Sequence, residues 1–185
     1  MRFYFNKDFK EILSSEIISL TGSLFAGLLL AIAEKKIFLV PGIFVLLPGF
    51  LAMRGEISAS FSSRIMEYLL EHRLKPDFRR AEHSKIVWQN LTASFILVLL
   101  IATLLGFFAF IITFMFFRIY YPAIILVSII AGLIANMIEI PLTLSAIIWF
   151  YNKKIDPGNV MGPFVTTTGD ITSILAILVT IMVML

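Results

Sequence analysis

Long stretches without a charged side chain constrain this sequence more than any other feature. Uncharged runs cover residues 17–33, 37–53, 86–117 and 119–138, and two more, 157–169 and 171–185, flank a single Asp. These lengths are close to the roughly 20 apolar residues that cross the hydrocarbon core of a bilayer. With 59% hydrophobic residues, the chain is expected to lie mostly in lipid rather than to form a soluble domain.

The runs predict an all-α integral membrane protein with five transmembrane helices. We expect the helices at about 12–33, 37–55, 86–117, 120–151 and 159–184. The polar segment 56–85 is too short for a domain, and its spacing predicts a short cytoplasmic helix or helical hairpin broken at Pro76. Residues 1–185 are thus expected to form one transmembrane module. The first run resembles a signal peptide, but Glu34-Lys35-Lys36 follows it directly, so we expect it to be retained.

The positions of Lys and Arg predict the orientation in the plasma membrane. A cytoplasmic N-terminus places 12 of the 15 basic residues inside and only Lys35, Lys36 and Arg118 outside. The C-terminus is then outside, since the number of spans is odd. Because the basic residues lie between the spans, the net charge of +3 marks topology and indicates no nucleic-acid partner.

Cysteine is absent from the chain, and this limits the metal chemistry. Disulfides and thiolate sites are excluded, so a bound metal must use oxygen or imidazole ligands. Oxygen ligands favour hard cations such as Mg²⁺.

Two acidic residues fall within predicted spans, where ionisable groups are costly and call for an explanation. Asp170 lies near the middle of the last span, and no Lys or Arg in a predicted span is placed to pair with it, so we expect water or a cation as its partner. Glu139 follows Asn136 by three residues on one helix face. It is either protonated and hydrogen-bonded between helices or a direct participant in transport.

Other polar features line the predicted spans. Pro41 and Pro48, Pro141 and Pro163 would each free a backbone carbonyl that can bind a hard cation. Arg54 is expected to snorkel to the cytoplasmic surface at the end of its helix. Glu56, beside it, is expected either to pair with a neighbouring Arg or to form a second, inner cation site.

Two motifs resemble those of a known family. Residues 156–170 read Asp-Pro-Gly-Asn-Val-Met-Gly-Pro-Phe-Val-Thr-Thr-Thr-Gly-Asp, which is similar to the last-helix signature of the MgtE and solute carrier 41 magnesium transporters. Residues 48–56, followed by Ser63-Arg64-Ile65, resemble the Pro-x-Leu-x-x-Lys-Gly-Asn segment of the solute carrier 41 proteins. The family usually has Asn where this chain has Glu56.

This resemblance implies transport of Mg²⁺ or a related divalent cation through a pore. Asp170 would hold the ion largely through its water shell. The chain contains one five-helix module with no internal repeat, so the resemblance implies a homodimer with one pore on its two-fold axis. The sequence carries no counterpart of the MgtE gating domains, so the resemblance implies no gating mechanism for this chain. The metal-site residues predicted are Asp170, Glu56, Thr166, Thr167, Gly169, Glu139 and Asn136.

Two other function classes remain as alternatives. A membrane-embedded enzyme would need a nucleophile or a metal motif, and the sequence contains no His-Glu-x-x-His, no Gly-x-Ser-x-Gly and no Cys. We therefore expect no enzyme activity and no cofactor beyond the transported ion. An accessory membrane subunit is the second alternative. Channel or coupled carrier, the direction of flux and the selectivity among Mg²⁺, Mn²⁺, Co²⁺ and Ca²⁺ are left open.

Overall fold

The structure is a computed structural model that describes residues 7–81 and 83–184. These residues form an all-helical fold, so the predicted fold class is confirmed. Five of the helices are long and apolar enough to cross a membrane. The helices are α1 Lys7–Ile32, α2 Glu34–Ile37, α3 Ile43–Leu70, α4 Phe78–Ala81, α5 Lys85–Phe117, α6 Ala123–Asn152 and α7 Pro157–Met184.

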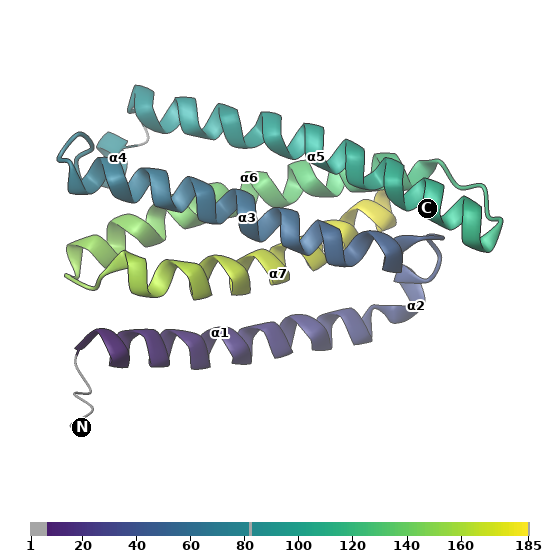
Figure 1. The fold of residues 1–185 in the computed structure, drawn as a ribbon, viewed down its shortest axis with the longest axis horizontal. Coiled ribbons are helices and arrows are strands. Elements are labelled where there is room, and N and C mark those ends of the chain that lie inside the picture. Colours follow the sequence, from purple (N-terminus) through teal and green to yellow (C-terminus); the bar gives the residue numbers. More distant parts are fainter. Residues whose placement is uncertain (1–6, 82, 185) are drawn as a thin grey trace.

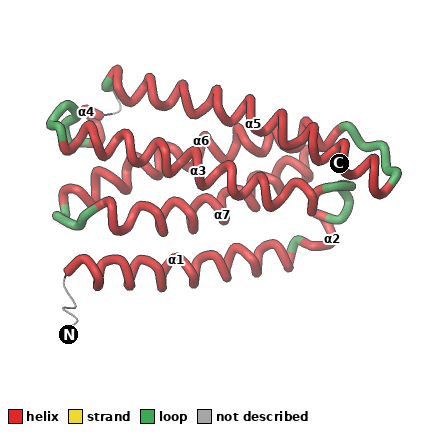
Figure 2. The backbone as a smooth tube through the Cα atoms, in the orientation of Figure 1, coloured by secondary structure: helices red, strands yellow, loops and turns green. Residues whose placement is uncertain are grey.

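Four of the long helices form a bundle, and the fifth lies on its outside. Helices α3, α5, α6 and α7 pack against one another, with α6 in contact with the other three. Helix α1 packs along α7 and forms the edge of the molecule (Figure 1). The chain reverses at short connections, so α1 begins and α7 ends at opposite ends of the bundle (Figure 2).

The second span is longer than predicted. A boundary near residue 55 was expected because charged residues follow it, but α3 continues as one helix to Leu70. The apolar residues Ile57, Phe61, Ile65 and Leu69 recur every four residues and are buried, while the charges of this segment lie mostly on the other face. The helix ends where His72 adopts a left-handed φ of 58°.

The apolar core of the bundle has two parts. One cluster includes Leu46 and Phe50 of α3 with Ile177 of α7, and the other includes Phe61 of α3 and Ile147 of α6. Close helix contact supports the first cluster, since a Cβ on Gly106 would lie 2.7 Å from the Cα of Ile125. Buried polar side chains of α3, α5 and α6 lie between the two clusters.

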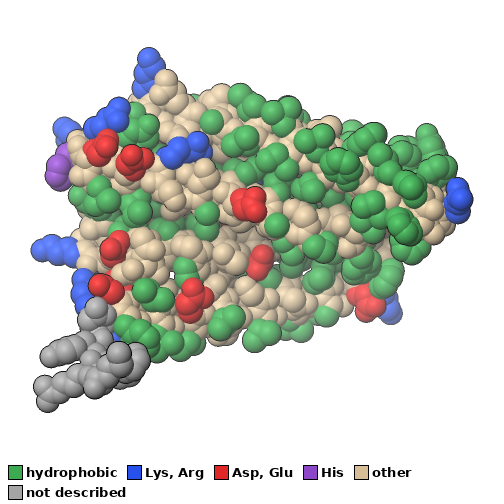
Figure 3. Space-filling view, in the orientation of Figure 1, with side chains coloured by type: hydrophobic (Ala, Val, Ile, Leu, Met, Phe, Trp, Pro, Cys, Tyr) green, Lys and Arg blue, Asp and Glu red, His purple; other side chains and the backbone are tan. Residues whose placement is uncertain are grey.

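The surface fits a bilayer environment. Large apolar side chains are exposed on α1, α5, α6 and the C-terminal half of α7, as expected where lipid tails replace water, whereas on α3 only Phe44 and Leu70 near its two ends are exposed. Basic side chains gather mainly at the end of the bundle where α1 begins, and acidic side chains also occur near the middle of the visible face (Figure 3). Arg2, which the orientation argument counts among the inner residues, lies outside the described residues.

Candidate cation site and buried ion pair

Asp170 lies in the middle of α7 and is partly exposed. Its Oδ2 accepts a hydrogen bond of 3.0 Å from the hydroxyl of Ser23 on α1. Among the described residues, no Lys or Arg pairs with it, and no group of three or more His, Cys, Asp or Glu could hold a metal. Asp170 is therefore a carboxylate at mid-span with one hydroxyl partner and with acceptor capacity left for a ligand.

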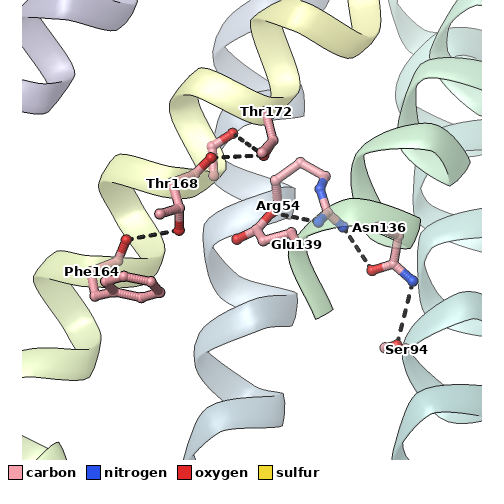
Figure 4. A network of polar contacts seen from close by, with 8 residues as sticks. Arg54, Ser94, Asn136, Glu139, Phe164, Thr168 and Thr172 are labelled. Carbon is pink, nitrogen blue, oxygen red and sulfur yellow. Dashed lines mark hydrogen bonds and ion pairs between the residues drawn. The ribbon is translucent and has the colours of Figure 1, made fainter. Parts of the chain in front are cut away.

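Arg54 does not snorkel to the surface, and this part of the prediction is wrong. Its side chain is fully buried and reaches from α3 to two partners on α6. Nη2 forms an ion pair with Oε2 of Glu139, and Nη1 donates a 2.9 Å hydrogen bond to Oδ1 of Asn136 (Figure 4). The sequence reading ended this span one residue after Arg54, whereas the helix continues for four more turns.

The partners of Arg54 are themselves fully buried. Nδ2 of Asn136 lies 3.4 Å from the hydroxyl of Ser94 on α5, which extends the network across the bundle (Figure 4). A guanidinium and a carboxylate cancel in net charge, which is what makes the burial of both groups tolerable in this layer. Asn136 and Glu139 thus link helices. Their part in cation binding stays a prediction, and it would require Arg54 to release both side chains.

Gly169 separates this network from Asp170. A Cβ at Gly169 would lie 3.0 Å from Oε1 of Glu139, so the glycine lets α7 approach the buried pair closely. The next residue, Asp170, turns to α1 instead. The two intramembrane carboxylates therefore lie on different sides of α7. That of Glu139 is neutralised by Arg54, whereas that of Asp170 has no cationic partner among the described residues.

The threonines before Asp170 hydrogen-bond mostly to their own helix. Thr166 donates to the carbonyl of Gly162 at 3.0 Å, and Thr168 donates to that of Phe164 at 2.8 Å. Thr167 lies 2.8 Å from the hydroxyl oxygen of Ser19 on α1. Thr166 is exposed, and its hydroxyl proton is donated within the helix. Its oxygen lone pairs therefore stay free to accept hydrogen bonds from the waters of a hydrated ion.

Glu56 lies at mid-helix rather than at the end of its span. It is exposed and follows buried Arg54 by two residues, so its side chain points to the opposite side of α3. The expected ion pair with Arg54 is absent because Arg54 pairs with Glu139, and no ion pair joins Glu56 to Arg64 in the described part of the chain. The exposed face of α3 that carries Glu56 is otherwise small and polar, with Ala52, Ser60, Ser63 and Glu67.

The prolines have different roles. Pro48, Pro141 and Pro163 lie inside helices as predicted, whereas Pro41 lies in the turn before α3 and frees no helical carbonyl. Pro163 leaves the carbonyl of Asn159 without a helical donor, and the hydroxyl of Ser15 on α1 donates to it at 3.2 Å.

A comparison with known proteins decides the family. The family model of the MgtE divalent cation transporters matches residues 47–180, which is most of the chain and includes α4, α5 and α6 and most of α3 and α7. The chain belongs to the MgtE family. No match to it is found among curated proteins or among solved structures.

Membership of the MgtE family makes the chain a multi-pass membrane protein of a divalent cation transporter family, which is a family of transporters and not of enzymes. Asp170, the Arg54 network and Glu56 all fall within the matched residues. Helix α1 lies outside them. The hydroxyl that contacts Asp170 therefore comes from a helix that the family match does not include.

Ser23 and Ser94 are the site residues that sequence reasoning missed. Serines are common in membrane helices, so neither stands out as a single residue. The spacing of Glu11, Ser15, Ser19 and Ser23, four residues apart on one face of α1, was the signal that could have indicated a polar helix contact.

Proposed function

We propose that this chain transports Mg²⁺ across the membrane as a homodimer, with a pore on the two-fold axis and Asp170 of each copy beside it. The observation that carries the proposal is a partly exposed carboxylate at mid-span, bound by one serine and by no cation of the described residues. Two such carboxylates, with their threonine neighbours, offer the oxygen ligands and the room for retained water that Mg²⁺ prefers. The divalent cation transporter family supports this assignment.

The exposed face of α3 supports a second copy beside this helix. A polar face with Glu56, Ser60 and Ser63 is costly against lipid tails but suits a water-filled pore or a protein partner. In a C2 dimer a surface at the two-fold axis meets its own copy. The polar face of α3 from the two copies would then line both sides of one channel.

The proposed orientation has a cytoplasmic N-terminus in the plasma membrane. Lys7, Lys85 and Lys154 lie at the end of the bundle opposite Lys35 and Arg118. The positive-inside rule assigns the more basic end to the cytoplasm.

Flux through purified protein tests the proposed function. Proteoliposomes that contain only this chain should take up Mg²⁺ in at least one of three conditions, which are no imposed gradient, a voltage and a sodium gradient. Uptake no greater than in empty liposomes under every gradient would refute the proposal and would favour an accessory subunit.

Crosslinking tests the dimer. Because the chain has no native Cys, Ser60→Cys should crosslink to its copy in native membranes when a short bifunctional maleimide is added. Leu100→Cys on α5 is a matched control, since Leu100 is also exposed but belongs to an apolar helix surface. Equal crosslinking of the two variants, or a monomer that still conducts, would contradict the proposed interface.

Glu56→Asn tests the predicted inner site. The substitution gives the residue that the resembled family usually has, so transport should persist. Removal of one negative charge from each copy should nevertheless raise the Mg²⁺ concentration for half-maximal flux. Glu71→Gln, an equally conservative change in the exposed turn after α3, is the control. An affinity and a selectivity both equal to wild type would remove Glu56 from the pathway.

A further inference from the structure

A continuous row of polar contacts joins α1 to α7. Every fourth residue of α1 is polar from its first residue to Ser23, so these side chains form one row of i, i+4 neighbours along the helix. They are Lys7, Glu11, Ser15, Ser19 and Ser23. Each one bonds to α7 or to the turn before it. Lys7 donates to the carbonyl of Lys154 at 2.8 Å, and Glu11 accepts from the side-chain amide of Asn159 at 3.2 Å. Ser15 donates to the Asn159 carbonyl at 3.2 Å, Ser19 accepts from Thr167 at 2.8 Å and Ser23 donates to Asp170 at 3.0 Å.

This row fixes how far α1 can slide along α7. Helix α1 is mostly exposed and packs almost wholly on α7 and the short α2, so its position is set by its contact with α7. A shift by one turn, about 5.4 Å, would move every donor away from its acceptor. In lipid, apolar helix surfaces give little preference between such positions, so the polar contacts decide the register.

Gly22 brings the two helices close at the level of the last contacts. A Cβ at this position would lie 2.1 Å from Cγ2 of Thr167, so any larger residue would displace the Thr167 side chain, which bonds to Ser19, or the helices themselves. Ser23 is the next residue and reaches Asp170 because of this approach. The end of the row is thus at the carboxylate to which transport has been assigned.

We infer that Ser23 is a positioning residue for cation transport, which holds the Asp170 carboxylate from α1 in the orientation that meets the ion. This inference rests on the proposed function of Asp170. The Ser23 hydroxyl occupies one lone pair of Oδ2 and restricts the rotamers of Asp170, so the other oxygen stays directed to the hydrated cation. Since the water shell of Mg²⁺ is a rigid octahedron, a fixed acceptor oxygen matches the positions of its waters better than those of the more adaptable Ca²⁺ shell.

The experiment measures Mg²⁺ and Ca²⁺ flux into proteoliposomes for Ser23→Ala, Ser23→Thr and the control Ser14→Ala. Ser14 is exposed, and its hydroxyl donates within α1, to the Glu11 carbonyl. We expect Ser23→Ala to raise the half-saturating Mg²⁺ concentration about tenfold, as for the loss of a hydrogen bond to a charged group at a partly exposed site. The preference for Mg²⁺ over Ca²⁺ should fall with it. Ser23→Thr keeps the hydroxyl and should restore both.

A second pair of variants tests the same contact without change to either partner. Gly22→Ala should push α1 from α7 and reproduce the loss of affinity and selectivity. Gly27→Ala should behave as wild type, since nothing lies within 4 Å of a Cβ there. Both changes raise helix propensity equally, so the difference reports the α1–α7 contact.

The outcomes separate this inference from the proposed function. Wild-type affinity and selectivity in Ser23→Ala and in Gly22→Ala, together with loss of flux in Asp170→Asn, would overturn the role of Ser23 and leave the pore assignment intact. Wild-type flux in Asp170→Asn would overturn both. A loss in Ser23→Ala that Ser23→Thr does not restore would also contradict positioning by the hydroxyl.

Discussion

Asp170→Asn should fold and insert normally yet lose divalent cation flux by about tenfold to a hundredfold. The substitution keeps the shape and the Ser23 contact but removes the charge that offsets the dehydration of a dication at mid-span. The measurement is the initial rate of Mg²⁺ uptake by proteoliposomes, with the amount of inserted protein held equal. The amide costs less to bury than the carboxylate, so stability should not fall.

Asp77→Asn provides the matched control for this substitution. Asp77 lies in the exposed turn before α4, where it pairs with Arg80 at 3.7 Å. Exposed pairs contribute little, so both flux and stability should stay near wild type. Equal flux in the two variants would remove Asp170 from the pathway.

Arg54→Met should destabilise the bundle by about 3–5 kcal/mol, because it leaves the buried carboxylate of Glu139 without its cation. Glu139→Gln should be damaging as well, since it leaves a buried guanidinium unpaired. A protonated Glu139, one of the two states expected from the sequence, would tolerate Gln, whereas a carboxylate paired with Arg54 does not. The measurement is the temperature at which the detergent-solubilised protein loses its monodisperse peak.

The double variant Arg54→Met with Glu139→Leu distinguishes charge pairing from general packing damage. An apolar pair of similar volume should recover most of the lost stability, as buried ion pairs are often replaceable in this way. Recovery of stability without recovery of flux would indicate that the pair also shapes the site next to Gly169. Additive losses from the two substitutions would contradict the pairing.

The five spans were predictable because apolar length alone decides whether a segment crosses a bilayer. The C-terminal end of α3 was not, since charge along the sequence conceals a buried stripe that includes Ile57 and Phe61. Asp170 was found from its isolation in an apolar run. The partner of Arg54 was not found because Glu139 is 85 residues away and the two meet only when α3 packs on α6.

The buried position of Arg54 has a consequence for how the protein enters the membrane during synthesis. Helix α3 is the least hydropathic of the five spans and carries a guanidinium near its middle, which costs about 2.5–3.5 kcal/mol in an isolated helix. Its partner carboxylate is on α6, two spans later in the chain. Helix α3 would therefore gain its full preference for the bilayer only after α6 has been synthesised. We expect α3, α5 and α6 to insert stably together rather than one by one. A chain truncated before Glu139 should leave α3 poorly inserted.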